Sequence, residues 1–245
     1  LEEQRRIAGI LDAADALRRR RREALALLDT LPGAIFAEMF GDNPDTPGDW
    51  PIKKFGDLVA ENLIGLVRGA KDISPDLPVP YLKMDSITRD GRIDFEKLVA
   101  IEASQEEIEK FSVAPGDLLF NTRNTKELVG KSAVYHGPEG VVINNNVMRI
   151  RMTCEASPDF ISSYLRSPFG RRQLEQRKSG TTSVFAIYAK NLMTLPVPVP
   201  PRDLIDEYDF RCRSGRDMRD QHVAHESELE TLFASLQSRA FAGEL

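Results

Sequence analysis

The sequence has little of the chemistry that enzymes place at their active sites: its 245 residues include two cysteines and three histidines. Cys154 and Cys212 show no metal or redox spacing, so we expect two reduced thiols and a cytoplasmic protein. His222 and His225 are spaced to share one helix face, but no third ligand follows, and polar packing between helices is the plainer interpretation. His136 is isolated. The sequence therefore predicts no metal site and no hydrolase triad.

Longer motifs are missing as well. No run of about 18 apolar residues exists, so we expect no membrane span. The start, LEEQRRIAGI, is charged and lacks the apolar stretch of a secretory signal. It also lacks an initiator methionine, and we expect a fragment or a processed piece. Val129-Gly130-Lys131-Ser132 ends like a phosphate-binding loop, but Thr125 stands where that motif needs glycine. We expect no catalytic activity and no bound cofactor.

Negative charge prevails overall, with a net charge of −5, which argues against bulk electrostatic binding of nucleic acid. The distribution is uneven, because residues 50–201 carry 20 basic and 18 acidic side chains while both ends of the chain are acidic. A DNA partner would therefore meet a local basic patch rather than a uniformly positive face.

The two ends of the chain resemble each other. At an offset of 205 residues, LLDTLPGAIFA (27–37) matches LFASLQSRAFA (232–242) at Leu27/Leu232, Leu31/Leu236, Phe36/Phe241 and Ala37/Ala242. A repeated helix on either side of a long unlike segment suggests a bracket that holds a domain. The plainer alternative is that two amphipathic helices share a leucine pattern.

Heptad spacing predicts a long helix over residues 2–40, which Pro32 should break or kink. Its predicted seam, meaning the rows that face a partner helix, combines Ile7, Ala14, Arg21, Leu28 and Ile35 with Ile10, Leu17, Ala24 and Leu31. A second helix is predicted over 202–242, with a weaker seam of Met218, His222, His225, Leu229, Leu232 and Leu236. We expect these two helices to pack on each other.

Between them, turn-rich residues 41–51 predict a linker, followed by mixed structure. Strands are expected at 79–87, 117–122, 131–136 and 140–152. Ser104 and Glu107 form a capping box for a helix at 105–111. Ser157-Pro158 and Ser167-Pro168 should start helices at 158–166 and 168–178, with Gly180 closing the second. Residues 195–201 read as an extended connector. The fold class is α+β: a mixed α/β domain bracketed by two long helices.

Two polar segments are candidates for DNA contact. Asn121-Thr122-Arg123-Asn124-Thr125-Lys126 follows a strand, and arginine suits guanine as asparagine suits adenine. The basic helix with Arg166, Arg171, Arg172, Arg177 and Lys178 runs into Ser179-Gly180-Thr181-Thr182-Ser183, which suits phosphates. The plainer interpretations are a solvated hairpin loop and a surface helix with a glycine cap.

Four segments together resemble one family: the opening helix LEEQRRIAGILDAADALRRRRREALALLDTL, then GDLLFNTRNTKELVGKSAVY, SPFGRRQLEQRKSGTTS and LPVPVPP. The chain is similar to the C-terminal half of the DNA-specificity subunit of type I restriction–modification enzymes. In that family two recognition domains each precede a long helix, the helices pair antiparallel, and each domain reads one half of a bipartite DNA site. The resemblance implies a spacer helix at 1–40, a linker at 41–51, a target-recognition domain at 52–201 and a second spacer helix at 202–245.

The resemblance further implies a specificity subunit without catalysis. Its partners would be double-stranded DNA and methyltransferase subunits, which hold S-adenosylmethionine, and through them an endonuclease–translocase subunit. The connector departs from the family, because PPRDLIDEY stands where PPLEEQ is usual. A coiled-coil scaffold without DNA readout, or the specificity piece of a fused restriction–methylation enzyme, are the alternatives. DNA contacts are expected at Arg123, Asn124, Thr125, Lys126, Arg171, Arg172, Arg177, Lys178, Ser179, Gly180, Thr181 and Thr182.

Overall fold

The computed structural model describes residues 2–41, 50–180 and 183–242. The chain divides into two compact units, a helical unit made of the residues up to Ile35 together with those from Phe210 onward, and a mixed unit of Phe36–Asp209. Most of the predicted linker, residues 42–49, lies outside the described residues.

The two predicted long helices are present as α1 (Glu2–Phe40) and α6 (Arg202–Ala242). The expected break at Pro32 is wrong, since α1 continues through it. Next to it, a side chain at Gly215 of α6 would come within 3.0 Å of Leu31. Proline removes one backbone hydrogen bond of α1 and crowds the carbonyl four residues earlier. Packing of the adjacent Leu31 against α6 opposes that cost.

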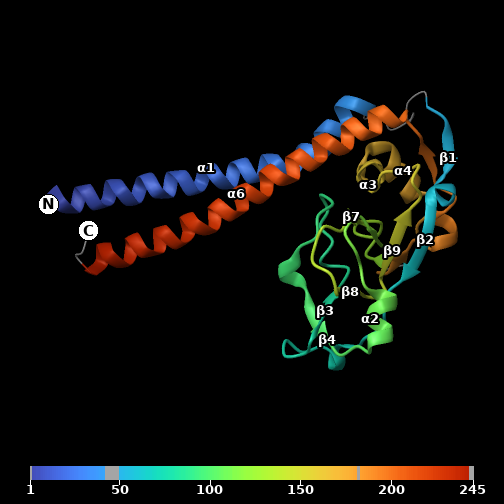
Figure 1. The fold of residues 1–245 in the computed structure, drawn as a ribbon, viewed down its shortest axis with the longest axis horizontal. Coiled ribbons are helices and arrows are strands. Elements are labelled where there is room, and N and C mark those ends of the chain that lie inside the picture. Colours follow the sequence, from blue (N-terminus) through green and yellow to red (C-terminus); the bar gives the residue numbers. More distant parts are fainter. Residues whose placement is uncertain (1, 42–49, 181–182, 243–245) are drawn as a thin grey trace. The chain divides into compact units, whose positions relative to one another are not determined.

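In the helical unit the two helices run antiparallel (Figure 1). Arg18 Nε donates to Glu230 Oε1 at 2.9 Å, and Arg219 Nε donates to Asp29 Oδ1 at 2.7 Å. As residue numbers rise along α1, those of the contacting residues on α6 fall, which is the antiparallel order implied by the family resemblance.

One predicted row of the α1 seam is confirmed, because Ile7, Ala14, Arg21, Leu28 and Ile35 are half-buried or buried. The other row is wrong at its centre: Leu17 is 53% exposed, whereas the side chain of Arg18 is only 17% exposed. The other members of that row, Ile10, Ala24 and Leu31, are half-buried as predicted. A further set of partly buried residues lies four positions after the members of the first row and widens the seam: Leu11, Arg18, Leu25 and Pro32.

On α6 the prediction holds for His222, Leu229 and Leu236, which are half-buried. It fails for Met218 and Leu232, which are 50% and 55% exposed, and for His225, which is exposed. The residues that lie in the seam instead are Gly215, Arg219, Glu226 and Phe233. A seam with this many charged members must satisfy them across the interface.

The arginine run at 18–22 supplies those partners. Arg21 Nη1 lies 2.8 Å from His222 Nδ1, and Arg22 Nη2 donates to Glu230 Oε1 at 2.9 Å. The guanidinium of Arg18 also lies 4.3 Å from the centre of the Phe233 ring, a cation–π contact. The middle of the helix pair is thus stabilised by ion pairs and hydrogen bonds as well as by packing of apolar side chains.

The mixed unit is built on a four-stranded antiparallel sheet in the order β2–β9–β5–β7. Its strands are β2 (Val59–Ile64), β9 (Val147–Met152), β5 (Leu118–Asn121) and β7 (Ser132–Val134). Leu118 pairs with Ile150 of β9 and Val134 of β7. Leu118, Leu119 and Phe120 occupy successive positions of β5 and are fully buried, so both faces of this strand are covered.

A second, three-stranded sheet has the order β4–β3–β8, with β3 parallel to β8. Its strands are β3 (Val79–Leu82), β4 (Val99–Ile101) and β8 (Val142–Ile143). Helix α2 (Gln105–Phe111) has the predicted capping box, since the Ser104 hydroxyl accepts from the Glu107 amide and the Glu107 carboxylate accepts from the Ser104 amide.

Helices α3 (Pro158–Arg166) and α4 (Pro168–Glu175) begin as predicted, with the hydroxyls of Ser157 and Ser167 accepting from the backbone of the first turn. The predicted extended connector contains β12 (Pro196–Pro198), which pairs with β1 (Ile52–Lys54). Short helix α5 (Ala189–Leu192) precedes it.

All four predicted strands are shorter than expected, and two of them end or break for a visible reason. The segment 79–87 leaves the sheet after Leu82 and turns. The segment 140–152 is interrupted because Asn144 Oδ1 accepts from the Asn146 amide at 2.9 Å. An asparagine side chain that binds backbone two residues on makes a turn, and this one separates β8 from β9.

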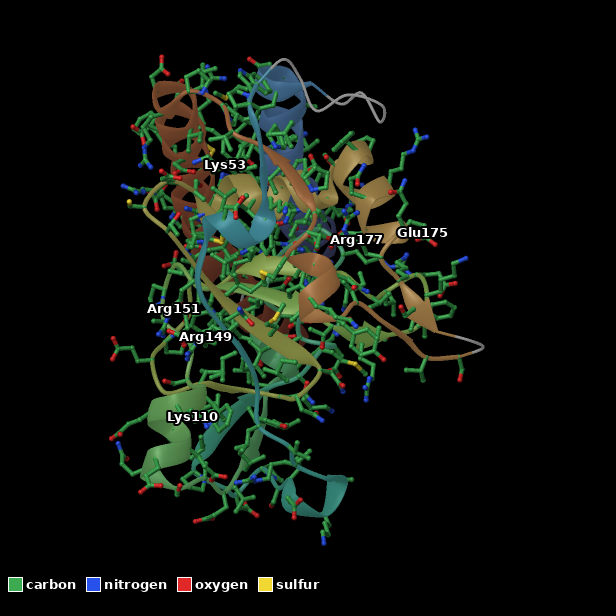
Figure 2. The ribbon with its side chains drawn as sticks, turned by 90° about the vertical axis from the view of Figure 1, so that its right-hand side faces the viewer. Lys53, Lys110, Arg149, Arg151, Glu175 and Arg177 are labelled. Atoms are coloured by element: carbon green, nitrogen blue, oxygen red, sulfur yellow. The ribbon has the colours of Figure 1, made fainter. Side chains whose placement is uncertain are left out.

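Arg149 of the four-stranded sheet is bound both to a neighbouring strand and to the end of α2; Figure 2 labels Arg149 and Lys110. Arg149, which is 4% exposed, donates to Glu61 Oε1 at 2.6 Å and to the backbone oxygens of Lys110 and Ser112. The guanidinium lowers the pKa of the Glu61 carboxyl. Because these donors satisfy carbonyls at the end of α2, they fix the helix against the sheet.

Candidate nucleic-acid interface

The structure joins the two candidate segments in one small ribbon of three strands, ordered β10–β11–β6. They are β10 (Ser179–Gly180), β11 (Phe185–Ala186) and β6 (Arg123–Asn124). Ala186 pairs with Ser179 on one side and with Arg123 on the other. Residues far apart in the sequence therefore lie one strand apart.

The first segment is anchored from beneath by Asn121, which is fully buried. Its side-chain amide donates to the backbone oxygens of Arg123 and Asn146, each at 3.0 Å, and its Oδ1 accepts from Asn124 Nδ2 at 2.9 Å. Asn124 Oδ1 in turn accepts from the Thr125 amide at 2.8 Å. Asn124 thus spends part of its hydrogen-bonding capacity on the loop, whereas the neighbouring Arg123, Thr125 and Lys126 are exposed.

The second segment is set by α4, which packs tightly on the preceding helix. A side chain at Gly170 would lie 2.0 Å from the Tyr164 oxygen, so only glycine fits there. Leu174 is buried beneath the helix, and Arg171 and Arg172 are exposed. The predicted helix at 168–178 is too long at its end. Helix α4 stops at Glu175, and the chain then turns so that Ser179 and Gly180 pair with β11.

Arg177 is engaged with backbone. Its guanidinium donates to the carbonyl oxygens of Gln173, Asn191 and Thr194 at 2.8, 3.2 and 3.1 Å. Burial lowers its pKa. Four of the five N–H groups of an arginine suffice for these contacts and the one to Gln173 Oε1 at 3.1 Å. Its described contacts therefore give Arg177 a positioning role, joining the end of α4 to α5 (Figure 2).

Lys126 and Lys178, one from each segment, meet at Glu175. Lys178 Nζ lies 2.6 Å from Glu175 Oε2 and donates to the backbone oxygen of Lys126 at 2.6 Å. Lys126 Nζ lies 3.6 Å from Glu175 Oε1. The hydrogen bond from Lys178 is the main cause that lowers the pKa of the Glu175 carboxyl.

The exposed surface of the ribbon carries both polar and apolar groups. Ser179 and Gly180 are exposed, while Thr181 and Thr182 lie outside the described residues. Val184 and Tyr188, on either side of β11, are 55% and 50% exposed. Neither residue was among the predicted contacts, although the run of apolar residues in SVFAIY (183–188) is consistent with a short strand. An exposed tyrosine offers a face for stacking or for a sugar.

The other segments considered as sites in the sequence are the loop around Lys131 and the possible metal ligands. Lys131, in the loop that resembles a phosphate-binding motif, donates to the backbone oxygens of Met84 and Ile87, and burial lowers its pKa. In the part of the chain that the structure describes, no three histidine, cysteine or acidic side chains are grouped to hold a metal ion. Over the same residues, no helix has an apolar stretch long enough to cross a membrane.

Solved structures with the same fold come from type I restriction–modification systems. The S subunit of a type I restriction–modification system from M. genitalium matches with a TM-score of 0.59 at 13% identity, over 96% of this chain and 59% of that one. A chain from a type I R-M system, described in work on its assembly and conformational transition, matches with a TM-score of 0.57 at 20% identity, over 100% of this chain and 60% of that one. The architecture is thus that of type I specificity subunits.

Sequence comparison agrees with it. The chain is 28% identical over 160 residues to the putative type I restriction enzyme MjaX specificity subunit of Methanocaldococcus jannaschii, covering 64% of this chain and 37% of that protein. It is 24% identical over 173 residues to the type I restriction enzyme EcoKI specificity subunit of Escherichia coli, covering 68% and 37%. No family model matches. The resemblance to type I specificity subunits is confirmed, and the chain spans little more than a third of these curated relatives.

Proposed function

We propose that this chain is the DNA-recognising part of a type I restriction specificity subunit and that it reads one half of a bipartite duplex site. The observation that carries the proposal is the ribbon β10–β11–β6, which brings the exposed residues Arg123, Lys126 and Ser179 close together, with the mostly buried Lys178 between the two segments. The names of the two curated relatives support a role in specificity. The role is recognition rather than catalysis.

The chemistry of this surface divides between two tasks. Arg171 and Arg172 are exposed on α4 and suit phosphates, which fix the register of a protein on DNA. Arg123 lies on the strand and suits a base edge, since arginine pairs with the two acceptors of guanine.

For partners, we propose that the helical unit binds a methyltransferase subunit, which would hold S-adenosylmethionine. Large apolar side chains that are exposed on both helices favour this. Leu17, Leu27, Met218 and Leu232 are each at least half exposed, and exposed apolar surface of this kind suits contact with a protein. These residues also support the second candidate function, a scaffold that binds protein partners without reading DNA.

The decisive experiment is methylome sequencing of cells with and without the intact gene. Loss of methylation at one sequence motif is the expected result. In vitro, the chain assembled with its methyltransferase should bind duplex DNA and select a sequence. Replacing Arg123, Lys126, Arg171 and Arg172 by alanine should abolish selection. If the parent complex never binds DNA while the helical unit still binds the methyltransferase, the scaffold function is the correct one.

A further inference from the structure

Glu175 is an acid among the basic side chains of this surface, where exposed Glu127 is a second acid near Lys126 and Lys178. Glu175 is the one carboxylate between residues 166 and 180, against five basic side chains. It ends α4, its side chain is 51% exposed, and its two oxygens face Lys178 and Lys126 at 2.6 and 3.6 Å. A carboxylate so placed holds the position that a DNA phosphate oxygen would take between the same two ammonium groups.

The two lysines differ in how firmly they are held. The side chain of Lys178 is 13% exposed and is bound at both Glu175 and the Lys126 backbone. The side chain of Lys126 is 56% exposed, and its distance of 3.6 Å to the carboxylate is that of an ion pair without a short hydrogen bond. Lys126 is thus the member that can turn toward DNA, while Lys178 keeps Glu175 in place.

We propose that Glu175 is a built-in counter-ion that limits sequence-independent binding: it neutralises Lys126 and Lys178, and DNA phosphates must compete with its carboxylate. The proposal rests on the function proposed above. Phosphate contacts supply nearly all non-specific affinity. A fixed carboxylate weakens that component for every sequence, so that a complex without base contacts stays too weak to persist, while a complex that adds base contacts does not.

The test is Glu175→Gln, which removes the charge and keeps the shape. The probe is a random-sequence duplex, titrated with the chain assembled with its methyltransferase at several salt concentrations. We expect about twofold to fivefold tighter binding, the range that one exposed ion pair spans. The salt slope should steepen by about 0.9, as for one added phosphate contact.

Glu106→Gln is the matched control, because this exposed acid lies on α2 and its loss changes the net charge equally. It should alter neither affinity nor slope. The gain from Glu175→Gln should also shrink in a Lys126→Ala background, since two groups that interact give non-additive changes.

The outcomes separate the two proposals. If the parent complex binds no DNA, both the function and the counter-ion role fail. If it binds and Glu175→Gln equals the parent or the Glu106 control, only the counter-ion role is overturned. Weaker binding by Glu175→Gln, with unchanged thermal stability, would also overturn it and make Glu175 a clamp that orients the lysines for phosphate.

Discussion

Lys178 Nζ lies 2.6 Å from the backbone oxygen of Lys126, although the two residues belong to different polar segments of the sequence. The contact joins the polar loop and the end of the basic helix, which the sequence predicted as two separate sites, into one surface. Strand β11 provides the connection, since it pairs with both segments. A surface built from separate segments in this way can bind phosphates with some residues and base edges with others.

Arg171→Ala should behave as the loss of a phosphate contact. Its side chain is exposed on α4 and therefore able to reach the DNA backbone. We expect weaker binding to all sequences by a similar factor and a salt slope lower by about one unit. Binding isotherms of the methyltransferase assembly at several salt concentrations measure both. A change in sequence preference would contradict the assignment.

Arg123→Ala should instead relax specificity. Its place on β6 next to β11 puts it on the ribbon, and loss of a base contact costs about 1–3 kcal/mol on the target only. Selection from a random duplex pool, followed by sequencing, should show one degenerate position. If the selected sequence is the same as for the parent, Arg123 does not read a base.

The sequence predicted elements whose signals are local. Capping serines at 157 and 167, the capping box at Ser104 and the long helices all appear where expected. The ribbon was beyond such reasoning, because strands of two residues carry almost no periodic signal and their pairing depends on tertiary contacts. Glu175 and Arg177 likewise acquire their roles only from what the fold brings beside them.

The seam shows a different limit. Apolar residues repeat every seven positions in two candidate rows of α1, and both have the spacing of a coiled coil. The row that includes Leu17 is more apolar, and its other members are half-buried, yet at its centre Arg18 rather than Leu17 contacts α6, through Glu230 and Phe233. Which of two adjacent residues contacts the partner helix depends on the side chains of that helix, which the pattern of one helix does not contain.

Leu28→Ala and Leu17→Ala form a matched pair that tests this seam. Leu28 is half-buried in the confirmed row, so its truncation should cost about 2 kcal/mol, the low end for a core leucine. Leu17 is 53% exposed, and its truncation should change the stability by less than about 0.5 kcal/mol. Chemical denaturation followed by circular dichroism measures both. Equal losses of stability would mean that Leu17 contributes as much to the seam as Leu28, and would contradict the observed seam.

Glu230 should make the helix pair sensitive to acid. Hydrogen bonding from Arg18 is the main cause that lowers the pKa of its carboxyl, and Arg22 adds to the effect. The carboxyl of an unfolded chain titrates at about 4.3, so a lowered pKa in the folded state means stability that is fully present above that pH. The contribution is lost as pH falls through the folded-state pKa. Glu230→Gln should therefore melt at a lower temperature than the parent at pH 7, and the gap should narrow as the pH falls below the unfolded-chain value and through the lowered folded-state pKa. Thermal melts by circular dichroism measure the gap, with exposed Glu228→Gln on the same helix as the control. A gap that persists undiminished in acid would mean that Glu230 stabilises the pair through packing rather than through its charge.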